Sequence, residues 1–144
     1  MRIALNEAQA AARRGEAPIG AVVVDEASGA VVARAANGPI ALHDPTAHAE
    51  ILALRSAAAK LGNYRLPGLS LFVTLEPCAM CAGAISHARI SRLVFGAADP
   101  KGGAVENGPR FFAQPTCHWR PMVTGGVLAD ESAALLRAFF QARR

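Results

Sequence analysis

Short apolar runs that alternate with helical segments constrain the fold of this chain more than any other feature of its sequence. LFVTL at 71–75 and RLVFG at 92–96 are typical of buried strands, and the segment from Pro77 to about Ala88 between them reads as a helix. A strand, a helix and a second strand in this order form a crossover unit whose two strands run parallel. The second half of the chain therefore predicts a parallel pair of strands.

A β-hairpin is predicted nearer the N-terminus. AVVVD at 21–25 and AVVAR at 30–34 are β-branched runs, and the ASG between them is typical of a turn. The hairpin would add an antiparallel pair to the sheet, which makes the predicted sheet mixed. The remaining predicted elements are helices at 2–14, 46–62 and 129–144 and a short strand within HWRPMV at 118–123.

The composition is that of a globular protein of ordinary size. The chain has 144 residues, of which 52% are hydrophobic and 18% charged, enough to bury the core of one domain over residues 1–144. We therefore expect an α/β fold, a three-layer α/β/α sandwich around a mixed, about five-stranded sheet. The net charge of +4 permits a polyanionic partner without requiring one. Neither a membrane span nor a signal peptide is present, so we expect no membrane association and a cytoplasmic location.

Two short motifs carry the residues that could bind a metal. TAHAE at 46–50 contains His48 after Thr46, the predicted N-cap of a helix, and PCAMC at 77–81 contains Cys78 and Cys81. Thiols at a helix start lie beside free N–H groups and the positive end of the dipole, which favours thiolate ligands. A catalytic zinc site takes three protein ligands and keeps a fourth position for water. We predict His48, Cys78 and Cys81 as these ligands, with Cys117 outside the site.

Two glutamates flank the predicted ligands. Zinc acidifies a coordinated water, and a nearby carboxylate can accept its proton and pass it on. Glu50, two residues after His48, is the predicted catalytic group in that role. Glu76, two residues before Cys78, is predicted to hold the cysteine turn through hydrogen bonds.

Each motif also has other interpretations when it is taken alone. C-x-x-C is compatible with a redox pair or with half of a structural zinc site, and H-x-E occurs on solvated helix faces. A binding module that is stabilised by zinc without catalysis would coordinate its metal fully and would not need Glu50.

The two motifs together, H-x-E followed by P-C-x-x-C, resemble the signature of zinc-dependent nucleobase deaminases. Further segments are similar to bacterial tRNA-specific adenosine deaminases, although residues 104–121 depart from the commoner loop of that family. The resemblance implies a cytidine deaminase-like fold and a homodimer. The similar segments are EAPIGAVVV, NGPIALHDPTAHAEILALR, NYRLPG, LFVTLEPCAMCAGAISHARISRLVFGAADPKGGA and LLRAFFQARR.

The function that the resemblance implies is hydrolytic deamination of adenosine to inosine at the wobble position of a tRNA anticodon, with release of ammonia. Zn²⁺ would be the cofactor, held by the three predicted ligands, and the tRNA anticodon stem-loop the partner. The alternative within the same fold is a free-base or nucleoside deaminase that acts on guanine or cytosine. The resemblance further implies substrate contacts by Asn37, by the backbone N–H of Ala49, and by Asp99 and Lys101, with Lys101 binding phosphates. Arg143 and Arg144 are candidates for the same role, but a solvated helix end is the favoured interpretation of these two residues.

Overall fold

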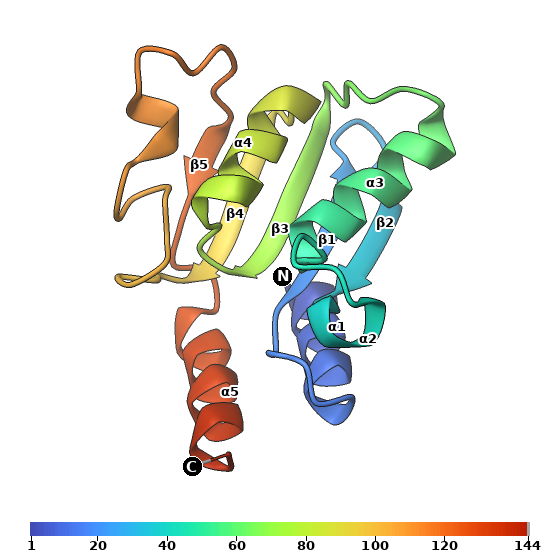
Figure 1. Cartoon of the computed structure of the whole chain (residues 1–144). Helices are drawn as coiled ribbons and strands as arrows, with labels where there is room; N and C mark the ends of the chain where they lie inside the picture. Colours follow the sequence, from blue (N-terminus) through green and yellow to red (C-terminus); the bar gives the residue numbers. More distant parts are fainter. Residues whose placement is uncertain (144) are drawn as a thin grey trace.

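A five-stranded sheet runs through the centre of the computed structural model, which describes residues 1–143 (Figure 1). The strand order is β2-β1-β3-β4-β5. β1 pairs antiparallel with β2 and β3, whereas β3 with β4 and β4 with β5 form parallel pairs. The predicted mixed sheet is therefore confirmed. The strands are β1 (Gly20–Asp25), β2 (Val31–Ala36), β3 (Leu69–Leu75), β4 (Arg92–Ala97) and β5 (Met122–Thr124).

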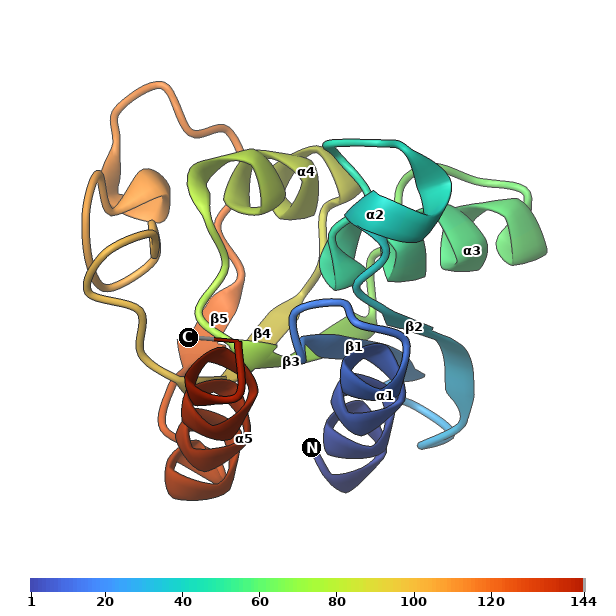
Figure 2. The same cartoon turned by 60° about the horizontal axis from the view of Figure 1, so that its bottom comes forward.

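Helices cover both faces of this sheet. α1 and α5 pack on one face and α3 and α4 on the other (Figure 2), which confirms the predicted three-layer α/β/α sandwich. α2 and the short 3-10 helix η1 lie in connecting segments. The helices are α1 (Arg2–Arg13), α2 (Pro39–Leu42), α3 (Ala49–Leu61), α4 (Ala79–Ala88), η1 (Phe111–Ala113) and α5 (Ala129–Gln141).

The densest part of the core lies along the parallel pair of β3 and β4. In their register Leu71 pairs with Leu93 and Val73 with Phe95, and none of the four is more than 1% exposed. Helices on both faces bury these strands, which is why their sequences read as continuous apolar runs. Each such side chain that leaves water stabilises the fold by about 1.5–3 kcal/mol. This packing fixes the end of β3, from which the chain enters the cysteine motif and α4.

The prediction of Thr46 as the N-cap of α3 is wrong. The helix begins at Ala49 and its N-cap is His48. Asp44 Oδ1 accepts hydrogen bonds from both the backbone N–H and the hydroxyl of Thr46, at 2.8 and 2.7 Å. This local turn competes with the helix for the threonine side chain. As a result, the helix start is left to His48, whose side chain makes no capping bond.

Smaller differences concern the ends of elements. α4 begins at Ala79, two residues after Pro77, and α2 forms in a connection where no helix was predicted. α5 ends at Gln141, and Arg144, predicted at the end of this helix, lies outside the described residues. None of the helices within residues 1–143 is long and apolar enough to cross a membrane.

Candidate active site

The predicted metal ligands come from the first turns of two helices. His48 is the N-cap of α3 and Cys78 the N-cap of α4, both in extended backbone conformations. Cys81 is the third residue of α4, and the side chains of an N-cap and of the third helical residue lie on the same side of the first turn. The C-x-x-C spacing therefore aims both sulfurs at one point. Since neither N-cap side chain makes a capping bond, all three are free to bind a metal.

The distances between these side chains suit a tetrahedral zinc site. His48 Nδ1 lies 3.7 Å from Cys78 Sγ and 3.6 Å from Cys81 Sγ, and the three ligand atoms all lie within 4.8 Å of one another. Zn–S and Zn–N bonds of about 2.3 and 2.1 Å at tetrahedral angles place a sulfur and a nitrogen ligand about 3.6 Å apart. One imidazole and two thiols are also a donor set that zinc favours. The structure thus brings together the three residues that the sequence predicted.

The ionisation of the two cysteines is coupled. Hydrogen bonds from Cys81 and His48 lower the pKa of Cys78 to about 4, so that this sulfur is a thiolate at neutral pH. The hydrogen bond to Cys78 and burial raise the pKa of Cys81. The two sulfurs therefore share a proton, which a divalent cation would displace.

Glu50 is buried beside the ligands without being one of them. It is the second residue of α3 and only 4% exposed. Burial raises the pKa of its carboxyl group, partly opposed by its own backbone N–H and by His48. Its Oε2 atom is fully buried and has no hydrogen-bond partner among the described residues. A buried oxygen without a partner is costly unless a ligand or water completes it.

Asn37 also keeps a buried side-chain oxygen without a partner among the described residues. Its side chain is 5% exposed, and the unpaired atom is Oδ1. The next residue, Gly38, donates its N–H to Ala47 O at 3.0 Å, which fixes this segment directly before His48. Ala49 is the first residue of α3, where the backbone N–H has no acceptor within the helix. The first turn of α3 thus offers a free backbone donor, and Asn37 and Glu50 each keep an unpaired buried oxygen among the described residues.

Glu76 does not hold the cysteine turn as predicted. Its Oε1 atom accepts three backbone N–H bonds from residues 105–107, at 2.8–3.1 Å, and its Oε2 atom accepts the N–H of Asp99 at 2.9 Å and the side-chain amide of Asn107. Burial alone would raise the pKa of this carboxyl, but these hydrogen bonds lower it. The loop in turn donates Ala104 N–H to Pro77 O at 2.9 Å. Glu76 therefore ties the loop at 99–107 to the segment that carries Cys78.

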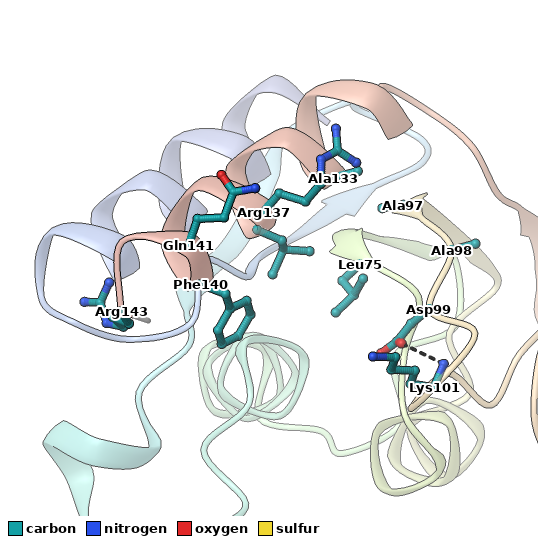
Figure 3. Close-up of a pocket in the computed structure, with 11 residues that line it drawn as sticks. Leu75, Ala97, Ala98, Asp99, Lys101, Ala133, Arg137, Phe140, Gln141 and Arg143 are labelled. Carbon is teal, nitrogen blue, oxygen red and sulfur yellow. Dashed lines mark hydrogen bonds between the residues drawn. The ribbon is translucent and has the colours of Figure 1, made fainter.

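Asp99 and Lys101 lie outside the ligand cluster, on a cavity of about 790 Å³ between the end of β4 and α5 (Figure 3). Asp99 Oδ1 accepts the backbone N–H of Lys101 at 3.1 Å, which orders the turn between them. Arg143 also lines this cavity, and its guanidinium stacks 3.5 Å from the ring centroid of Phe139. The cavity is thus bordered by the loop that Glu76 holds.

Sequence reasoning missed the contribution of α5 to this cavity. Arg137, Phe140 and Gln141 lie on one face of the helix at spacings of three and four residues, and all three line the cavity (Figure 3). Phe140 is 50% exposed although it is aromatic, whereas Phe139 is buried. The signal in the sequence was the periodic placement of these residues, but the partner face across the cavity could not be read from it.

Comparisons with known proteins agree with this geometry. Residues 1–97 match the model of the cytidine and deoxycytidylate deaminase zinc-binding region. The tRNA-specific adenosine deaminase of Agrobacterium fabrum is 58% identical over 144 residues, which are 100% of this chain and 93% of the relative.

Two solved structures extend the comparison. One, from a study of A-to-I editing by tRNA:A34 deaminases at the wobble position of transfer RNA, has a TM-score of 0.92 at 58% identity and covers 94% of this chain and 97% of its own. A guanine deaminase from Nitrosomonas europaea has a TM-score of 0.83 at 28% identity, over 96% of this chain and 81% of its own. Together with the matched zinc-binding region, these likenesses show that the chain belongs to the cytidine and deoxycytidylate deaminase zinc-binding family.

Proposed function

We propose that this protein hydrolyses adenosine to inosine at the wobble position of a tRNA anticodon and releases ammonia. The assignment of this reaction rests on the cluster of His48, Cys78 and Cys81 and on the nearby Glu50, whose carboxylate keeps one oxygen without a partner among the described residues. The choice of substrate is supported by the full-length identity of 58% to a tRNA-specific adenosine deaminase, against 28% to a guanine deaminase.

The chemistry assigns one task to each group at the site. His48, Cys78 and Cys81 would hold zinc, which would supply Lewis acidity for the attack of a water molecule on the carbon that bears the amine. Glu50 accepts a proton from the water and passes it to the ring nitrogen of the purine. It then takes the proton of the new hydroxyl group and passes it to the departing amine, so that ammonia leaves as a neutral molecule. The amide of Asn37 hydrogen-bonds the base, and the N–H of Ala49 orients the reacting carbon's new oxygen.

The RNA contacts belong to the neighbouring cavity. Asp99 and Lys101 border it on one side and Arg143 on the other, so that a base flanking the reactive adenosine would meet both a carboxylate and cations. Lys101 and Arg143 would bind phosphates of the anticodon stem-loop. The anticodon loop presents its bases already splayed, which reduces the cost of extracting one.

The proposal further treats residues 1–144 as a single domain that acts as a homodimer in the cytoplasm, where tRNA is found. A groove of about 360 Å³ between α3 and α4, lined mainly by apolar side chains such as Ile51, Leu54 and Ala84, supports the dimer, because a second copy would cover it. Light scattering at micromolar concentration would measure the expected mass, and a monomeric mass would remove this part of the proposal.

The competing function is deamination of a free base or nucleoside, favoured by the likeness to guanine deaminase. The zinc chemistry would be the same in both cases. The decisive experiment incubates the purified protein with an anticodon stem-loop that carries adenosine at the wobble position, and separately with guanine, cytosine and adenosine. We expect inosine in the RNA and no ammonia from the small molecules. Ammonia from guanine or cytosine with unchanged RNA would establish the competing function instead.

A further inference from the structure

A polar cavity of about 380 Å³ lies at the C-terminal end of α4, away from the cysteines at its start. The segments after α3 and before β5 both reach this end of the helix (Figure 1). The described residues that line the cavity include four basic and three aromatic side chains, and no carboxylate. Those on which the proposal rests are Arg65, Arg89, His118 and Trp119.

Hydrogen bonds to the end of α4 hold the walls of this cavity in place. Leu66 N–H donates to Ala88 O at 2.7 Å, which fixes the segment that carries Arg65. Trp119 Nε1–H donates to Ile90 O at 2.8 Å, and the Ser86 hydroxyl donates to Trp119 O at 2.9 Å. The cavity is therefore formed in the free protein, and a ligand would have little left to order.

Two arginines in the cavity are oriented but not neutralised. The guanidinium of Arg65 lies 5.3 Å from the ring centroid of Tyr64, and that of Arg89 lies 5.9 Å from the ring centroid of Trp119. Stacking of this kind orients the planar group and leaves N–H donors in its plane available. Within residues 1–143, ion pairs form at Arg2, Arg34 and Arg55 but not at these two. Both cations are therefore available to an anionic ligand.

Arg89 also occupies an unusual backbone conformation. It is the C-cap of α4 with φ of 56°, in the left-handed region where glycine or asparagine is usual. A cation at a helix C-terminus complements the dipole, but this does not explain why a second arginine from another segment meets it in the same cavity. Local strain beside a preformed cationic cavity points to a binding role.

We propose that this cavity binds the sugar-phosphate backbone of the tRNA substrate, at a point separate from the reactive base. The inference rests on the proposed tRNA substrate. Arginine forks match phosphate oxygens, so the two guanidinium groups that form no ion pair among the described residues are the groups that would bind this backbone. α4 has 10 residues, so the cavity lies roughly 15 Å along the helix from the metal ligands, less than the length of a folded tRNA.

The test compares two variants that remove the same charge. Arg65→Gln/Arg89→Gln empties the cavity of its arginines, whereas Arg34→Gln/Lys60→Gln removes two exposed cations at the β2 edge of the protein. Binding of a full tRNA is measured at several salt concentrations, and turnover at saturating tRNA. We expect the first variant alone to bind about tenfold or more weakly at low salt, with a salt slope smaller by about two units. Its turnover at saturation should stay unchanged, because neither arginine lies at the reaction centre.

The outcomes separate this inference from the proposed function. If the wild type deaminates an anticodon stem-loop and both variants bind full tRNA equally well, the cavity is not a phosphate site. If the wild type makes no inosine at all, the proposed function fails first. Arg65→Lys/Arg89→Lys keeps the charges and should recover most of the salt slope; a slope still as low as that of the glutamine variant would contradict phosphate binding. Should the double glutamine variant fold poorly, Arg65→Gln alone, at an exposed position, should lose about one unit of slope.

Discussion

At the scale of single residues, His48 and Glu50 are placed differently relative to the cysteine sulfurs although only one residue separates them. His48 projects its imidazole from the N-cap towards both cysteine sulfurs. Glu50 is buried within the first turn and keeps one oxygen without a protein partner. A ligand must stay bound throughout the reaction, whereas a proton carrier must remain free to change its protonation state. Loss of metal and loss of turnover should therefore be separable by substitution.

Replacement of Glu50 by glutamine tests the proton carrier. The amide keeps the shape of the side chain but cannot accept a proton from water, so we expect turnover to fall by about 100- to 10,000-fold. Zinc content should remain at the wild-type value, because no ligand is changed. Ammonia release and metal analysis on the same preparation measure both quantities. Turnover close to wild type in Glu50→Gln would show that another group carries the proton.

Replacement of Cys78 by serine tests the ligand set. A serine hydroxyl is a poor zinc ligand near neutral pH because it stays protonated, so we expect less zinc in the purified variant than in the wild type. Cys117→Ser is the matched control, because Cys117 is a buried free thiol near Ser86 and Trp119, away from the cluster. Metal analysis of both variants should show loss only in the first. Equal zinc content in the two variants would remove Cys78 from the ligand set.

At the scale of elements, the loop at 99–107 is held by one carboxylate. Glu76 accepts five hydrogen bonds from this loop and has no cationic partner within residues 1–143. Adding a Cβ atom at Gly103 would place it 2.5 Å from Glu76 Cδ, so the loop also packs closely on the carboxylate. The position of Asp99 and Lys101 therefore depends on a residue at the end of β3.

Glu76→Gln should loosen this loop. The amide NH₂ group would face at least one of the N–H groups whose hydrogen bonds the carboxylate now accepts. We expect this to lower the free energy of unfolding by about 2–3 kcal/mol. The effect should appear in urea unfolding with zinc present and as faster hydrogen exchange at 99–107. Glu106→Gln is the matched control, an exposed carboxyl in the same loop, which should change stability by less than about 0.5 kcal/mol. Equal stability of the two variants would contradict the role given to Glu76.

At the scale of the whole molecule, local patterns in the sequence predicted the sheet and picked out three side chains that the structure brings together. Strands such as β3 and β4 are buried on both faces, and their apolar runs reveal this directly. The hydrogen bonds of Glu76 and the cavity against α5 could not be predicted, because they join segments 23 or more residues apart and no local pattern shows which segments meet. The N-cap of α3 was missed because Asp44 captured the threonine hydroxyl.

Zinc should stabilise the entire fold, because its predicted ligands His48 and Cys78 lie 30 residues apart in the sequence, at the starts of two different helices. A metal that binds the folded chain and not the unfolded one adds about 2.7 kcal/mol at 100 times its dissociation constant and about 4.1 kcal/mol at 1,000 times. We therefore expect the unfolding midpoint of chelator-treated protein to rise steadily as zinc is added. Cys78→Ser should shift the rise to higher zinc concentrations. If the unfolding midpoint of the wild type does not depend on zinc, His48, Cys78 and Cys81 do not form a metal site between α3 and α4. The proposed deamination would then have no metal ion to activate the water molecule.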